Sequence, residues 1–350
     1  MAGWRIIRAE PEDRQRWDAY VNQHPDSSAY HLAAWRQAVE RAYRFAGVYL
    51  MAVRGTDICG VLPMIHCKIP LLAGCLVSLP YCDVGATLAD NAEIATSLEQ
   101  EAIRRARQYD CRQVMLRSST PSGSEHCVDL NSGDKVRMIL DLPPDSEQLL
   151  AGLKAKVRSQ VKKPVRDGLT CQVGGQDLIE LFYRVFARNM RDLGSPVHGM
   201  PWIRAVMQCY GDRARIAVVY TSSGVPAAAG LVLMHRSSMA IPWASSLRDY
   251  NPQNPNMLLY WTLLKYAIDL GLSRFDFGRS TLNAGSYRFK KQWGAREEPL
   301  EWIDLLSAEK RQKPVAGGSA LRRFAETGWK CLPVPFSTSI GPLARRYISL

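Results

Sequence analysis

The sequence predicts an α+β protein with mixed sheets, in which two similar domains follow one another along the chain. The chain has 350 residues, which is long for one hydrophobic core and ordinary for two domains. Hydrophobic residues make up 47% of it, as in folded globular proteins. In addition, one succession of strands and helix occurs twice, and a repeated unit decides the architecture.

Each half of the chain contains a strand hairpin around a short polar turn with a glycine. In the first half, we expect strands at 48–53 and 58–66. In the second half, we expect strands at 216–220 and 225–235.

A third strand, a helix and a fourth strand then follow in both halves. They are expected at 75–80, 92–109 and 113–116 in the first half and at 238–246, 256–270 and 274–277 in the second. Each fourth strand runs into an Arg-Ser pair, Arg117-Ser118 and Arg279-Ser280. We therefore expect two domains of one fold.

The boundary between the domains is expected near Pro143 and Pro144, because prolines end a strand and resist helix formation. This predicts a first domain at 1–143, a second at 144–306 that carries the main site, and a basic extension at 307–350. No stretch sustains several apolar heptads, so no long coiled-coil arm is expected.

Positive charge is the clearest feature of the composition. The formal net charge of +12 favours an anionic partner, such as a phosphate-bearing cosubstrate, RNA or an anionic membrane surface. The densest positive cluster lies at 150–165, where the sequence has no acidic residue; it includes Lys154, Lys156, Arg158 and Lys162. Such a cluster is either a solvated helix face or a contact for phosphate or polynucleotide.

Cysteine and histidine usage argues against disulfides and metal sites. The nine cysteines form no C-x-x-C pair and most lie in apolar runs, which is typical of buried thiols in a reducing compartment. The six histidines show no ligand spacing, so no metal is expected. There is no apolar signal core at the start, and no run approaches the roughly 18 apolar residues of a membrane span. We therefore expect a cytoplasmic protein.

Two interpretations of the basic extension stay open. It can contact the inner face of the membrane as a peripheral segment. Alternatively it packs on the second domain, which is favoured because Pro333, Pro335 and Pro342 work against a long amphipathic helix.

The strand around Asp276 and the segment after it combine more chemical groups than any other part of the chain. Phe275 and Phe277 alternate with Asp276, so the rings share one face of the strand and the carboxylate lies on the other. The strand is expected to end at Gly278 and to lead into a basic aromatic loop at 285–295. Such a strand can bring its carboxylate, and the arginine and tyrosine that follow, to one cleft.

Three motifs resemble those of a known family. They are His31-Leu32-Ala33-Ala34-Trp35, the basic segment Lys156–Lys163, and Asp276-Phe277-Gly278-Arg279 followed by Trp293-Gly294-Ala295. Over most of its length the chain resembles FemAB-like proteins, which are built from two tandem GNAT acyltransferase domains. It is most similar to the FemAB-related proteins that accompany exosortase (PEP-CTERM) and exopolysaccharide systems.

This resemblance implies transfer of an acyl or aminoacyl group from aminoacyl-tRNA or acyl-CoA to an amine on a cell-envelope precursor, such as that of peptidoglycan, or on an exopolysaccharide precursor. No tightly bound cofactor is expected. Relatives that use acyl-CoA hold its pyrophosphate in a glycine-rich turn at a helix N-terminus. The corresponding segment here, Asn254-Pro255-Asn256-Met257, lacks glycine. Its asparagines are expected to cap the helix, and this disfavours acetyl-CoA.

The resemblance also implies catalytic roles. The reaction needs donors for an oxyanion and a route for a proton. In GNAT domains the donors come partly from backbone N–H groups where two neighbouring strands separate, here near Trp243 and Gly278. Asp276 would orient the acceptor amine or accept its proton, and Tyr287 would protonate a leaving oxygen. The structural alternatives are a turn glycine and an aspartate paired with an arginine such as Arg279.

Substrate contacts are expected from a further set of side chains. The cations would hold phosphate or carboxylate groups, Trp293 would stack on a base or sugar or else belong to the core, and two loop residues would line the acceptor groove or form an Asx turn. The set is Arg279, Lys290, Lys291, Trp293, Ser245, Asn256, Arg158, Lys162, Tyr81 and Asp83.

Two other functions stay open. A non-catalytic module would bind an anionic glycan or a nucleotide-sugar for an export system, which the missing glycine turn permits. A nucleic-acid-binding protein without chemistry is supported only by the positive charge and the basic segment.

Overall fold

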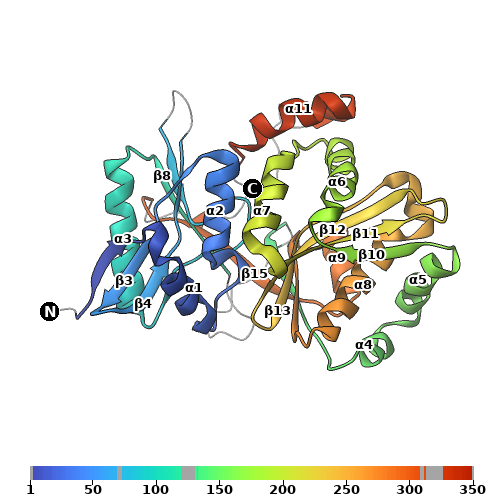
Figure 1. The fold of residues 1–350 in the computed structure, drawn as a ribbon, viewed down its shortest axis with the longest axis horizontal. Coiled ribbons are helices and arrows are strands. Elements are labelled where there is room, and N and C mark those ends of the chain that lie inside the picture. The colour runs from blue at the N-terminus through green and yellow to red at the C-terminus, as the bar shows by residue number, and fades with distance from the viewer. Residues whose placement is uncertain are drawn as a thin grey trace. The chain divides into compact units, whose positions relative to one another are not determined.

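The computed structural model of the protein describes residues 3–68, 73–119, 131, 133–307, 311–312 and 326–348. The chain forms two compact units (Figure 1). The first consists of Met1–Asp129, Pro299–Val315 and Tyr347–Leu350, and the second of Leu130–Glu298 and Ala316–Arg346. His126, Cys127 and the parts of the basic extension at 308–310 and 313–325 lie outside the described residues.

The division between the units falls before the expected boundary at 143. The reason is strand β9 (Lys135–Asp141), which was expected to close the first domain. It pairs antiparallel with β14 (Arg274–Thr281), and both strands belong to the second unit. A pairing between segments so far apart in the sequence leaves no local signal.

In its described residues, the first unit contains two groups of paired strands and three α-helices. One sheet has the strand order β1-β3-β4-β7, and the other strands follow the order β15-β8-β6-β5-β2. The elements are β1 (Arg5–Arg8), α1 (Arg14–Gln23), α2 (Ala33–Tyr43), β2 (Ala46–Gly47), β3 (Leu50–Arg54), β4 (Asp57–Leu62), β5 (Ile65–Cys67), β6 (Cys75–Val77), β7 (Leu88–Ala89), α3 (Ala92–Gln108) and β8 (Gln113–Ser119), with β15 (Arg296–Asp304) and β16 (Arg311–Gln312) returning later in the chain.

The second unit is a single sheet covered by helices on both faces. Its strand order is β10-β11-β12-β13-β14-β9. The elements, besides β9 and β14, are α4 (Ser146–Gly152), α5 (Ala155–Arg166), β10 (Thr170–Gly174), α6 (Ile179–Leu193), α7 (Met200–Tyr210), β11 (Ala214–Tyr220), β12 (Pro226–His235), β13 (Ser238–Ser246), α8 (Pro255–Asp269), α9 (Gly285–Lys291) and α11 (Val334–Arg345).

The two units repeat one strand arrangement, which confirms the predicted mixed α/β fold. In the first, β6 pairs antiparallel with β5 and parallel with β8; in the second, β13 pairs antiparallel with β12 and parallel with β14. The copies differ at Pro63, which separates β4 from β5 where β12 is continuous. Because proline has no N–H for a ladder hydrogen bond, it interrupts the strand in the first unit.

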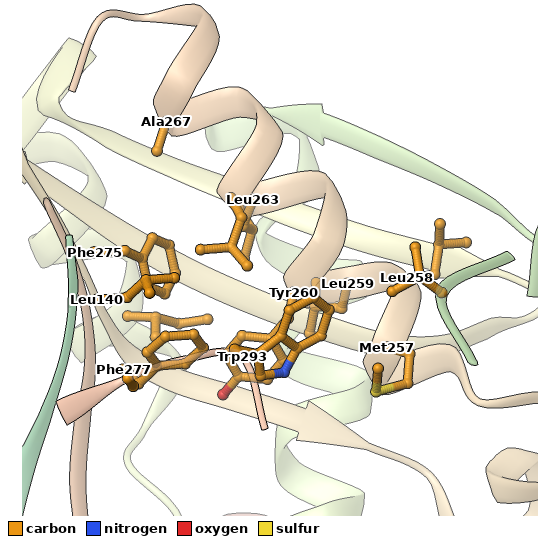
Figure 2. Close-up of a cluster of buried hydrophobic side chains, with 14 of the residues drawn as sticks. Leu140, Met257, Leu258, Leu259, Tyr260, Leu263, Ala267, Phe275, Phe277 and Trp293 are labelled. Atoms are coloured by element: carbon orange, nitrogen blue, oxygen red, sulfur yellow. The ribbon is translucent and has the colours of Figure 1, made fainter. Parts of the chain in front are cut away.

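The core of the second unit lies between its sheet and α8. Leu259, Leu263 and Ala267 are fully buried on one side of α8, and they pack against Phe275 and Phe277 of β14 (Figure 2). The two phenylalanines therefore share a face, as their alternation predicts. Since α6 covers the opposite face of β11–β13, both faces of these strands are buried, and β12 is almost continuously apolar.

The basic segment at 150–165 is two helices and not one. Helix α4 ends at Gly152, and α5 begins at Ala155. The guanidinium of Arg158 donates to the carbonyl of Leu153, with an Nη1–O distance of 2.5 Å. Arg158 therefore satisfies a backbone group at the end of α4, where helix carbonyls lack partners within the helix.

The end of the chain forms a helix in spite of its prolines. Pro335 occupies the first turn of α11, where its missing N–H costs nothing. The helix contacts α6 in the second unit. Arg191 of α6 donates to the carbonyl of Leu332 at 3.0 Å, and Arg345 of α11 donates from Nε to Nε2 of His198 at 3.1 Å. This part of the extension therefore packs on the second unit.

His198 makes the stability of this packing depend on pH. It is buried against Trp202 and Trp243, and burial together with the neighbouring Arg345 holds the pKa of His198 well below its usual value of 6.5. The folded protein therefore binds fewer protons than the unfolded chain below that pH, and the stabilisation is lost as the pH falls. We expect the free energy of unfolding to fall by about 2 kcal/mol for this group between pH 7 and pH 5.

Urea denaturation at several pH values measures this effect. Burial also lowers the pKa of His235, to about 4, so His198→Gln is expected to weaken the pH dependence without abolishing it. His24→Gln, at a less buried histidine, is the control. An unchanged pH dependence in the His198 variant would contradict the prediction.

Candidate active site

Two neighbouring strands of the second unit separate part of the way along their length. Strands β13 and β14 are paired in parallel at three positions, which end with Ala240 opposite Asp276. Beyond this point β13 remains paired with β12, and β14 with β9. Ile241–Ser246 of β13 and Phe277–Thr281 of β14 are therefore not paired with each other, and this separation of the two strands is here called the opening.

A β-bulge in β13 accompanies this separation. Leu233 faces Ala240 and Leu231 faces Trp243, so Ile241 and Pro242 stand opposite Val232 alone. An extra residue bends a strand and increases its twist. Pro242 has no N–H, which is tolerated where the neighbouring strand has moved away.

A second bulge lies opposite, in β14. Asp276 faces Ile139 and Arg279 faces Arg137, so Phe277 and Gly278 stand opposite Met138 alone. Gly278 has a φ of +70°, a backbone conformation that favours glycine. Strand β14 does not end at Gly278, as expected from the sequence; it continues to Thr281.

Asp276 is buried and holds this second bulge. Its Oδ2 accepts from Nε of Arg137 at 2.8 Å, and its Oδ1 accepts from the backbone N–H of Gly278 at 2.7 Å. The ion partner is thus Arg137 and not Arg279. Arg137 also lies 3.8 Å from Glu298, which is itself paired with Arg296 at 2.7 Å. These contacts show Asp276 and Gly278 as residues that shape the opening.

Lys290 supports the same bulge from α9. It is buried, and its Nζ donates to the carbonyls of Gly278 at 3.1 Å and Arg279 at 2.7 Å. A buried ammonium requires such partners. Two backbone carbonyls therefore bind the ammonium of Lys290, for which the sequence predicts an anionic ligand.

The predicted basic loop is helix α9, and with the end of α4 it borders a cavity of about 530 Å³, here called the α4–α9 pocket. The pocket has no carboxylate in its lining. It brings together the predicted residues Tyr287, Lys291 and Trp293. The lining residues are Pro143, Gln148, Leu149, Gly152, Leu153, Lys154, Tyr287, Arg288, Lys291, Gln292, Trp293 and Gly294.

The α4–α9 pocket is rich in cations and hydrogen-bond donors. Lys154 and Arg288 are exposed at its border. Lys291 is paired with Glu297 at 2.6 Å, and this hydrogen bond raises the pKa of the lysine. Trp293 is 1% exposed, and its Nε1 has no hydrogen-bond partner among the described residues. A buried donor without a protein partner is rare and can bind a water or a ligand.

A row of aromatic rings connects the bulge in β14 with the pocket. Phe277 stacks on Tyr260 at 5.4 Å, Tyr260 lies 5.1 Å from Phe289, and Phe289 lies 6.4 Å from Trp293. Figure 2 shows Trp293 in one cluster with Tyr260 and Met257 of α8. The opening and the pocket therefore border one continuous core.

Two other predicted contacts, Ser245 and Asn256, belong to β13 and to α8, the helix that follows it. Ser245 is buried on β13, and Asn189 of α6 donates to its hydroxyl at 3.1 Å. Asn256 lies in the first turn of α8. The expectation that asparagine side chains cap this helix is wrong, because Asn254 has a left-handed backbone with φ of +55° and makes no side-chain cap.

The remaining predicted residues are not brought to the pocket. Lys162 is exposed on α5 and, like Arg158, does not line it. Tyr81 and Asp83 belong to the first unit. The ring of Tyr81 packs on Tyr43 at 4.8 Å, and the carbonyl of Asp83 accepts from Trp302 at 3.2 Å.

Sequence reasoning missed Arg137 and Glu298, although a signal existed for the first. Arg137 is the one arginine in the largely apolar strand Lys135–Asp141, and such a residue needs a buried partner.

In the described part of the chain, no three His, Cys, Asp or Glu residues are placed to hold a metal ion. The eight described cysteines are free thiols. None of the described helices is long and apolar enough to cross a membrane.

A parallel pair of strands with a helix between them in the sequence occurs in both units, as β6, α3 and β8 in the first and as β13, α8 and β14 in the second. Residues 152–291 match the family model described as acetyltransferase (GNAT) domain. This match lies within the second unit and covers 140 of the 350 residues. No protein of curated function matches the chain in sequence.

Solved structures show the same fold. FemX is 14% identical, with a TM-score of 0.65, and the match covers 84% of this chain and 95% of that one. A tandem GNAT protein from the clavulanic acid biosynthesis pathway is 12% identical, with a TM-score of 0.55, over 86% of this chain and 98% of its own. L-PGS from Bacillus licheniformis is 14% identical, with a TM-score of 0.54, over 98% of both chains.

Proposed function

We propose that the protein is an N-acyltransferase that moves an acyl or aminoacyl group from an activated donor, aminoacyl-tRNA or acyl-CoA, to an amine on a cell-envelope or exopolysaccharide precursor. The observation that carries the proposal is the opening between β13 and β14 within the GNAT domain. The assignment to the FemAB-related proteins of exosortase systems rests on sequence motifs and is part of the proposal.

In the proposed reaction, a neutral amine attacks the donor carbonyl, and negative charge grows on the carbonyl oxygen. Backbone N–H groups in an opening of this kind can stabilise that charge without reorganising. The N–H of Gly278 is already bound to Asp276, so the donors proposed here belong to β13 beyond Ala240. The C–O bond of aminoacyl-tRNA or the C–S bond of acyl-CoA then breaks, and Tyr287 is the proposed proton source for the leaving oxygen or sulfur. The proton that the amine loses passes to water. Asp276 and Lys290 position the bulge.

The α4–α9 pocket is the proposed site for the nucleotide part of the donor. Aminoacyl-tRNA and acyl-CoA both end in adenosine and phosphate groups. Lys154, Arg288 and Lys291 supply positive charge, and Tyr287 supplies an aromatic ring. The buried indole N–H of Trp293, which also lines the pocket, has no partner among the described residues. Phosphates favour such cations, and bases favour such rings.

A charge-reversal pair tests this assignment. We expect Lys154→Glu with Arg288→Glu to weaken donor binding roughly tenfold to hundredfold, because two charge-assisted contacts become repulsive. Arg213→Glu with Lys265→Glu is the matched control, since both residues are exposed, lie outside the pocket lining and change the net charge equally. The measurements are binding of radiolabelled aminoacyl-tRNA or acyl-CoA and transfer to a panel of amines. Equal losses in both variants would mean that overall charge, and not the pocket, binds the donor.

A binding module without chemistry is the second candidate function. Two observations favour it. The N-terminus of α8 has no side-chain cap. The N–H of Gly278 is already bound to Asp276 and is not available to an oxyanion. If neither donor is consumed with any amine, while a nucleotide-sugar binds the wild type and not Arg279→Ala, this second function replaces the first.

A further inference from the structure

Helix α11 has one face that packs on the second unit. Ser337 and Gly341, four residues apart, are buried on this face. A Cβ atom at Gly341 would lie 3.1 Å from the backbone nitrogen of Val197, so the absence of a side chain allows close approach. With the contacts of Arg191 and Arg345, this face holds the helix in a fixed orientation.

The adjacent face of α11 is apolar and exposed. Phe336, Ile340 and Leu343 are 63%, 38% and 68% exposed. Their spacing of four and three residues places them in one stripe along the helix. These three residues form a contiguous exposed apolar patch on one short helix, and such patches mark interaction surfaces.

The sequence around this stripe is positively charged. Residues 307–350 contain eight lysines and arginines and two glutamates, so they carry a net charge of +6, which is half of the chain's +12. From Thr327 to the end there are three basic residues, Lys330, Arg345 and Arg346, and no acidic one. Of these three, Lys330 is exposed, whereas Arg345 donates to His198. An apolar stripe in a basic stretch of sequence without carboxylates complements a surface that is apolar inside and anionic outside.

We propose that α11 is an interfacial helix that docks the second unit on an anionic lipid bilayer by inserting Phe336, Ile340 and Leu343 between the headgroups. Helices of this kind bind through buried apolar area and attraction to anionic lipids. Because α11 is already held by its buried face, docking orders no new segment. The two interpretations of the basic extension are thereby compatible, since one face packs on the protein and the other meets the membrane.

Co-sedimentation of the full chain with vesicles tests the proposal. The vesicles contain phosphatidylcholine alone or phosphatidylcholine with phosphatidylglycerol. Phe336→Ser, Ile340→Ser and Leu343→Ser together are expected to lower the partition coefficient on the anionic vesicles at least about tenfold. The matched control is Val165→Ser, Val225→Ser and Leu270→Ser, three residues that are 61%, 41% and 48% exposed elsewhere in the second unit.

Thermal melts establish that both triple variants are folded. Support requires that the wild type and the control bind anionic vesicles, that phosphatidylcholine alone binds weakly, and that the stripe variant loses binding. Equal binding by the stripe variant overturns the proposal, as does a wild type that binds neither kind of vesicle. If the wild type sediments as a dimer that the stripe variant converts to a monomer, without vesicle binding, the occupant of the face is a second copy of the chain and the proposal is wrong. Donor consumption is measured separately, so failure here leaves the acyltransferase proposal standing.

Discussion

Replacing Arg137 with alanine is expected to lower the free energy of unfolding by about 3 to 5 kcal/mol, because it leaves the buried Asp276 carboxylate without its cation. Both partners are largely removed from water, with side chains 18% and 5% exposed. A buried carboxylate cannot recover its hydration when the guanidinium is removed. Urea denaturation at pH 7 measures the loss, and Arg137→Met, which preserves most of the packing, is expected to show a similar loss because it also lacks the charge.

A double-mutant cycle separates this pair from an ordinary surface contact. Arg137→Ala with Asp276→Ala is expected to cost less than the sum of the two single changes, because no charge stays buried alone. Arg188 and Asp249, 2.5 Å apart and 39% and 62% exposed, provide the comparison, with an expected coupling below about 1 kcal/mol. Similar coupling at both pairs would show that Asp276 is not held as the structure describes.

Whether an element of the fold could be predicted depends on whether its sequence signal is local. The hairpins, α3, α8 and the fourth strands could be predicted because apolar periodicity and turn residues are local. The repeat also predicted that the two units share one succession of strands and helix. The domain division could not be predicted in the same way, since β9 pairs with a strand more than a hundred residues later.

The same difference between local and long-range signals applies to the residues of the candidate site. Tyr287, Lys291 and Trp293 meet in one pocket because α9 and the turn after it bring them together. The loop prediction missed the helix itself, because a segment of seven residues, with glycine at its first position, gives a weak periodic signal. Lys290 shows most clearly what the sequence cannot predict. A lysine in a basic segment is typical of a ligand contact or a solvated side chain. This one is buried and donates to two backbone carbonyls. Only the positions of the bulge carbonyls reveal that role.

Trp293→Ala is expected to cost about 3 to 5 kcal/mol of unfolding free energy, because it empties a site in the core of the second unit. The indole is 1% exposed and belongs to the same cluster as Phe277 and Tyr260. Chemical denaturation measures the loss. A cost below about 1 kcal/mol would mean that the side chain does not pack as Figure 2 shows it.

Trp293→Phe separates packing from hydrogen bonding at the same position. Phenylalanine keeps an aromatic ring in contact with Phe289, so we expect it to restore a large part of the stability lost in the alanine variant. It lacks the indole N–H, which has no partner among the described residues, so the folded protein does not lose a hydrogen bond. If the proposed donor supplies that partner, the phenylalanine variant binds it about fivefold to tenfold more weakly, as the loss of one hydrogen bond predicts. Equal donor affinity in the two proteins would leave the indole a purely structural role, and the nucleotide would then have to be held by the cations at the border of the pocket.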